Sequence, residues 1–183
     1  TNCSVGYNSL RGSATAADNT GNANTAIGTY CLEANTSGDG GTALGTGCLA
    51  KNTSADYNTS VGYYSLYNAV GGGGNVAVGK QSLFNVVDGV RNVGIGYEAA
   101  SSTNSGSKNI AIGESPLQSN AGGTNNIAIG TLALQSAVNV DNNVAIGTQA
   151  LQDVTCRHNV AVGPFALQEL VGTGDVNVED GFN

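Results

Sequence analysis

Residues 143–151 read NVAIGTQAL, and nearly the same nine letters recur as NIAIGTLAL at 126–134 and as NVAVGPFAL at 159–167. Each copy follows one pattern: Asn, variable, small, aliphatic, Gly, two variable residues, small, Leu. Ten copies follow one another at intervals of 22 residues, then seven times 17, then 16. A repeat at a fixed period of this length is typical of solenoid proteins. The glycines at position five are Gly6, Gly28, Gly45, Gly62, Gly79, Gly96, Gly113, Gly130, Gly147 and Gly163.

The repeat unit has the period-two alternation of a short strand. In NVAIG, Val144 and Ile146 point to one side of an extended chain and Ala145 points to the other. The Gly at position five and the Asn at position one are predicted turn residues. One short strand cannot bury itself, so we expect each to pair with its equivalent one coil away, at about 4.8 Å. The sequence therefore predicts an all-β fold, a parallel β-roll (β-solenoid) of about ten 17-residue coils.

The repeats also predict where the roll begins and ends. Residues 1–170 are the predicted roll, with the excess length of the first interval in a surface loop at 11–23. Residues 171–183 are predicted to be an irregular end or a junction to a following domain. Asn177 and Gly181 keep the unit spacing there, but Glu179 and Asp180 replace the small and aliphatic residues.

Two apolar positions divide the predicted core from a predicted interface. Position four is aliphatic in every unit and is interpreted as the structural core. Position two changes from Thr in units two to four to Val or Ile in units five to ten, and is interpreted as a more tolerant interface. A thin coil has room inside for one or two aliphatic side chains, so we expect neighbouring subunits to cover the second position. Which position faces a shared axis is left open. The predicted core residues are Val5, Ile27, Leu44, Val61, Val78, Ile95, Ile112, Ile129, Ile146 and Val162.

Composition and motifs argue against several function classes. A net charge of −7 and only six basic residues argue against nucleic-acid binding. No apolar run approaches the roughly 18 residues of a membrane span, so we expect no membrane insertion by this segment. The sequence has no GxSxG, no GxxxxGK[ST] and no GxGxxG opening a helix, and its cysteines lack zinc-site spacing. We therefore expect no enzyme activity, no catalytic residue and no cofactor.

The acidic residues and the one histidine offer weak candidates for metal binding. Asp39 and Asp56 are 17 residues apart and should stack on successive coils, where they could share a calcium ion. The next equivalent positions carry no acid, which favours solvated loop carboxylates. His158, in the loop 153–158, is interpreted as an ordinary loop residue.

Two cysteines and five tyrosines are further candidates. Cys31 and Cys48 share position eight of adjacent units, within the Cα range of a disulfide, although two small buried thiols are the favoured interpretation. Exposed aromatic rings on a rigid polar rod suit a carbohydrate or protein receptor, and packing between coils or chains is the equal alternative. The possible receptor contacts are Tyr30, Tyr63, Tyr64, Tyr67 and Tyr97.

The unit NVAIG…AL resembles the repeat of the YadA-like heads of trimeric autotransporter adhesins and of related phage tail fibres. The resemblance covers residues 2–167 in ten copies. It implies a left-handed parallel β-roll, three chains about one axis, and a role in attachment outside a bacterial cell or on a virion tail fibre. The unit is longer than is usual in bacterial heads, and no neck, stalk or anchor is recognisable.

The leading hypothesis is a non-enzymatic fibrous adhesin or tail-fibre module. Its expected partners are two further copies of the chain and a glycan or protein receptor on a host cell. The alternative is a purely structural shaft with binding elsewhere. An ice-binding solenoid is the outside alternative, because Thr25, Thr42 and Thr59 form a ladder at position two that stops after three coils. The left-handed β-helix of acyltransferases is disfavoured, because it needs an aliphatic residue at every sixth position.

Overall fold

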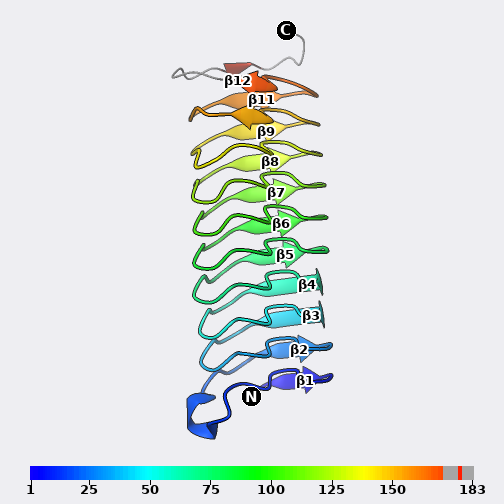
Figure 1. Cartoon of the computed structure of the whole chain (residues 1–183), viewed down its shortest axis with the longest axis vertical. Coiled ribbons are helices and arrows are strands. Elements are labelled where there is room, and N and C mark those ends of the chain that lie inside the picture. Colours follow the sequence, from blue (N-terminus) through cyan, green and yellow to red (C-terminus); the bar gives the residue numbers. More distant parts are fainter. Residues whose placement is uncertain (171–176, 179–183) are drawn as a thin grey trace.

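The structure, a computed structural model, describes residues 1–170 and 177–178, and its strands lie one above another in a tall stack (Figure 1). Each repeat contributes one strand of three to five residues, and loops complete the coil. The strands are β1 (Cys3–Val5), β2 (Thr25–Ile27), β3 (Thr42–Thr46), β4 (Thr59–Tyr63), β5 (Val76–Val78), β6 (Val93–Ile95), β7 (Ile110–Ile112), β8 (Ile127–Ile129), β9 (Val144–Ile146), β10 (Asp153–Val154), β11 (Val160–Val162), β12 (Glu169–Leu170) and β13 (Asn177–Val178).

One eleven-stranded parallel sheet runs the length of the stack, in the order β1 to β9, then β11 and β13. Equivalent positions are partners throughout, as Val93 pairs with Ile110 and Ile95 with Ile112. A second, two-stranded parallel sheet joins β10 and β12. The predicted all-β parallel solenoid, with coils roughly 17 residues apart, is confirmed.

Both irregular stretches of the sequence have a place in this arrangement. The long first interval contains a 3-10 turn, η1 (Ala16–Asp18), which projects from the base of the stack (Figure 1). Most of the predicted end segment 171–183 lies outside the described residues. Within it, β13 pairs with β11 and places Asn177 opposite Val160, so Asn177 occupies position two of a coil rather than position one. The sheet therefore continues into the segment predicted as irregular.

The prediction that position four forms the core is wrong for the single chain. All ten of these residues are at least partly exposed, from 59% at Val5 to the half-buried Ile112 and Ile129. The other members are Ile27, Leu44, Val61, Val78, Ile95, Ile146 and Val162. Position three is inside instead, because the narrow coil admits only a small side chain there. At Gly94, an added methyl group would lie only 2.8 Å from Leu83 Cγ.

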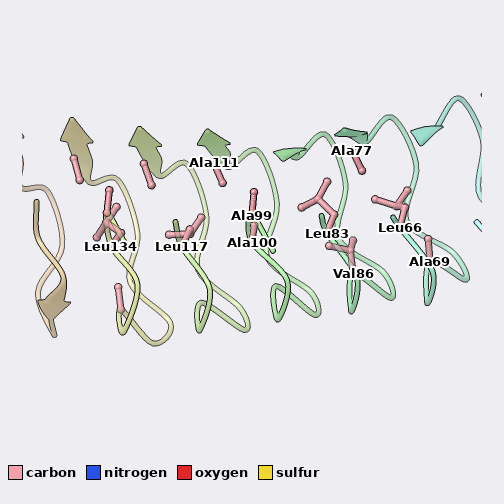
Figure 2. Packing of buried hydrophobic residues seen from close by; sticks show 14 of the residues in the cluster. Leu66, Ala69, Ala77, Leu83, Val86, Ala99, Ala100, Ala111, Leu117 and Leu134 are labelled. Carbon is pink, nitrogen blue, oxygen red and sulfur yellow. The ribbon is translucent and has the colours of Figure 1, made fainter. Parts of the chain in front are cut away.

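Leucine at position nine fills the interior opposite the small residues. Figure 2 shows Leu66, Leu83, Leu117 and Leu134 in the coils below the strands that carry Ala77 and Ala111. All nine leucines at this position have a left-handed backbone, with φ between 47° and 52°. That conformation costs on the order of 1–3 kcal/mol and is worse for β-branched residues. Burial of Leu offsets the cost, which explains why Val and Ile never occupy this position.

The asparagines at position one form a buried ladder rather than turns, because none of them has positive φ. From Asn58 to Asn143, the side-chain oxygen of each one accepts a hydrogen bond from the backbone N–H of the next, as Asn92 Oδ1 does from Asn109 N at 3.0 Å. Its amide donates to a loop carbonyl, as Asn109 Nδ2 does to Gly123 O at 2.8 Å. We call this set the asparagine ladder: Asn24, Asn58, Asn75, Asn92, Asn109, Asn126, Asn143 and Asn159.

The glycines at position five have φ between 126° and 137°. A backbone of this kind agrees with the prediction that they are turn residues. They also allow close approach of successive coils. A methyl group added at Gly28 or Gly96 would overlap the carbonyl of the equivalent glycine in the next coil. L-residues rarely adopt this backbone, so glycine is needed here for both reasons.

Candidate receptor-binding surface

Three of the five predicted receptor tyrosines lie together. The ring centroids of Tyr63 and Tyr64 are 4.3 Å apart, and those of Tyr64 and Tyr67 are 5.1 Å apart. Tyr67 stacks on Phe84 with a centroid distance of 5.4 Å and an interplanar angle of 6°. Lys51 Nζ lies 5.1 Å from the Tyr67 ring centroid, within cation–π range. We call these four aromatic residues the aromatic cluster.

The other two predicted tyrosines lie apart from this cluster. Tyr30 makes an edge-to-face contact with Tyr7 at 5.5 Å, and Lys80 Nζ lies 5.2 Å from the ring of Tyr97. A hydrogen bond with the Glu98 carboxylate and its negative charge raise the pKa of Tyr97. Hydrogen bonding with Tyr63 likewise raises the pKa of Tyr64. Both phenols, like ordinary tyrosines, are protonated at neutral pH and can donate hydrogen bonds.

Two hollows flank the aromatic cluster. A pocket of about 160 Å³ is lined by Gln81, Phe84, Asn85, Glu98 and Ser101. A groove of about 500 Å³ continues from Asn85, which lines both. The groove residues are Lys51, Asn68, Val70, Asn85, Val87, Ser102, Asn104 and Ala121. The sequence prediction of aromatic contacts missed these polar neighbours.

Asp39 and Asp56 lie on successive coils, as predicted, and each accepts a hydrogen bond from the backbone of the preceding coil. Asp56 Oδ1 accepts a hydrogen bond from Asp39 N at 2.8 Å, and Asp39 Oδ1 accepts one from Asn22 N at 2.6 Å. Each carboxylate thus joins its coil to the preceding one. In the part of the chain that the structure describes, no group of three or more His, Cys, Asp or Glu side chains could hold a metal ion. His158 is exposed, with Nε2 3.4 Å from Asn142 Nδ2.

Cys31 and Cys48 are fully buried free thiols in adjacent coils. Cys31 Sγ donates to Gly45 O at 2.8 Å and Cys48 Sγ to Gly62 O at 2.9 Å. The hydrogen bond with Cys48 and burial raise the pKa of the Cys31 thiol. No disulfide joins them, and the structure matches the favoured interpretation of two small buried thiols.

In comparisons with known proteins, no protein-family model, no curated protein and no solved structure matches the chain. Across the residues that the structure describes, no helix has the length and apolar character needed to cross a membrane.

Proposed function

We propose that the chain is a non-enzymatic adhesive fibre module in which three copies pack side by side and present receptor-binding surface. The observation that carries this proposal is the outer face of the long sheet. Positions two and four both point outward there, so a double row of aliphatic side chains follows the stack from β5 to β11. A continuous exposed apolar row of this kind marks a protein interaction site.

Identical copies are the partner that fits this face best. The row repeats once per coil. Only a partner whose own surface repeats at the same spacing can cover the row along its whole length. A position-four side chain such as Ile95, 38% exposed, would gain roughly 0.6–1.2 kcal/mol on full burial. Ten coils together supply a driving force on the order of 10 kcal/mol per chain before the entropic cost of association.

The remaining surface suits attachment. The aromatic cluster and its two hollows belong to positions six to thirteen of the coils, and of these residues only Tyr63 lies in a strand, at the end of β4. A trimer joined through the sheet would leave them accessible to a glycan or protein receptor on a host cell. Together with the resemblance to adhesin heads and tail fibres, this arrangement favours an extracellular role on a bacterial surface or a virion tail fibre.

Light scattering coupled to size-exclusion chromatography tests the trimer. We expect a mass near three times 18.2 kDa. The double variant Ile112→Asp, Ile129→Asp should shift the mass to that of one chain, because charges would replace apolar contacts at the interface. The matched control Ser37→Asp, Ser54→Asp adds the same charge to exposed loop positions and should stay trimeric. A folded wild-type chain that runs as a monomer would overturn the proposal.

A purely structural shaft would have the same mass but would bind no receptor. Binding of the purified trimer to host cells, measured by flow cytometry, separates the two functions. The ice-binding alternative retains one supporting feature, since Thr25, Thr42 and Thr59 all point outward from the sheet. Thermal hysteresis of the purified protein tests it directly.

A further inference from the structure

Phe84 has one aromatic face covered and one beside a hollow. Successive coils stack in register at position ten, since Asn68 N donates to Phe84 O at 3.0 Å and Asn85 N donates to Ser101 O at 2.9 Å. Phe84 therefore lies between Tyr67 in one neighbouring coil and Ser101 in the other. Tyr67 stacks on the first face. The small Ser101 side chain leaves the pocket of about 160 Å³ beside the second.

The polar groups around this pocket are held in place by neighbours outside it. Glu98 Oε2 accepts a hydrogen bond from Gln118 Nε2 at 3.0 Å. Gln118 in turn accepts one from Gln135 at 3.1 Å, the first step of a glutamine ladder that continues through Gln152. Glu98 is thus held by Gln118 and by the Tyr97 hydroxyl, and the lone pairs of its carboxylate that remain can accept from a ligand hydroxyl. Such preorganisation lowers the entropic cost of binding.

Asn85 supplies the complementary donor. Its Oδ1 accepts from Asn68 Nδ2 at 2.8 Å, and nothing among the described residues accepts from its own Nδ2. Asn85 also joins the pocket to the larger groove, where Asn68, Asn85 and Ser102 form a polar row beside a mostly aliphatic one. Donors and acceptors therefore recur along the groove at about the 4.8 Å spacing of the coils.

This combination matches the chemistry of a sugar chain. A pyranose ring has an apolar C–H face that packs on an aromatic ring. The hydroxyl groups at its edge both donate and accept hydrogen bonds. A pocket of this volume holds about one ring, and the groove extends it along the stack. The carboxylate of Glu98 and the net charge of −7 disfavour a polyanion. The aliphatic side chains of the groove, Val70, Val87 and Ala121, form only a narrow apolar strip for the face of a helical peptide.

We propose that Phe84, Glu98 and Asn85 form a primary subsite for one ring of a neutral oligosaccharide, and that the groove from Lys51 to Ala121 holds the rest of the chain. The ring stacks on the open face of Phe84, Glu98 accepts from its hydroxyls, and Asn85 donates to them. The inference deepens the proposed adhesive function and rests on it, since it names the ligand class of the receptor.

The direct test is binding of the purified full chain to a printed array of neutral oligosaccharides of the gluco-, galacto-, manno- and N-acetylhexosamine series. The best-bound oligosaccharide is then titrated calorimetrically. Ser101→Tyr should extend the Tyr67–Phe84 stack over the open face and block the pocket without weakening the fold. We expect at least a roughly tenfold loss of affinity, as for Phe84→Ala. The control Tyr7→Ala removes an exposed ring from the first coil and should leave binding unchanged.

The outcomes separate the site from the wider function. Array binding that is lost in Ser101→Tyr, while the melting temperature is kept, supports the subsite. A trimer that binds no oligosaccharide of the array, or whose affinity Ser101→Tyr leaves unchanged, overturns it. The mass of the same sample is measured alongside, because a monomer would refute the proposed trimer instead. A trimer that binds host cells through a protein alone would keep the adhesive function and reject this inference.

Discussion

Asn109→Ala tests whether the asparagine ladder holds the coils together. Asn109 Nδ2 donates to Gly123 O at 2.8 Å, and Asn109 Oδ1 accepts from Asn126 N at 3.0 Å and from Asn126 Nδ2 at 3.1 Å. Asn92, Asn109 and Asn126 are all fully buried. Removing the side chain leaves a backbone N–H and a carbonyl in the interior without partners.

The expected cost follows from those two groups. Each buried polar group left unsatisfied costs about 1–3 kcal/mol, so Asn109→Ala should lower the free energy of unfolding by about 4 kcal/mol. The loss should be large because coils depend on their neighbours, and Asn109 lies between two of them. Urea unfolding followed by circular dichroism, at one fixed chain concentration, measures the change.

Asn104→Ala is the matched control. Asn104 is an exposed loop residue only five positions away in the chain, so its replacement should change stability by no more than about 0.5 kcal/mol. A loss below about 1 kcal/mol for Asn109→Ala would refute the reasoning, because it would mean that water or rearranged loops replace the ladder at no cost. Equal losses for the two variants would refute it as well.

Three further predictions concern the interior. Gly96→Ala should cost about 3 kcal/mol or more in chemical unfolding, because it combines a forbidden φ with overlap on the next coil, whereas the exposed Gly71→Ala should be nearly neutral. Ala111→Leu should cost about 2 kcal/mol by overpacking the coil, and an unchanged melting curve would contradict a narrow interior. Cys31 and Cys48 should resist a maleimide in the folded chain and react after unfolding in urea, counted by mass spectrometry.

The sequence predicted the repeat correctly because the same residue types recur at a nearly fixed spacing. Glycine at position five and the alternation around it determine a short strand and a sharp turn, and stacking follows from the inability of one unit to bury itself. Alternation separates two faces but does not say which one is inside. The deciding fact is the width of the coil, and the consistently small residues from Ala26 to Ala161 fit that width.

Two features of position one and position nine escaped prediction for a different reason. Asparagine suits both turns and hydrogen-bonded ladders, and only the register of neighbouring coils selects the ladder. Leucine rarely takes positive φ, so nothing in its ordinary preferences indicates the conformation of Leu83 or Leu117. In both cases the stacking of coils determines a local structure that the intrinsic preference of the residue does not favour.

The candidate site shows how a repeat separates stability from function. The fold needs fixed residues at positions one, three, five and nine, which leaves positions seven, ten and eleven free to differ between coils. Chemistry is then determined by which side chains meet across the 17-residue period, as Tyr67, Phe84 and Ser101 do. A list of tyrosines along the chain could locate the aromatic cluster, but not the hollow. The hollow arises because a serine follows a phenylalanine one coil later, so its position is found by comparing residues 17 apart.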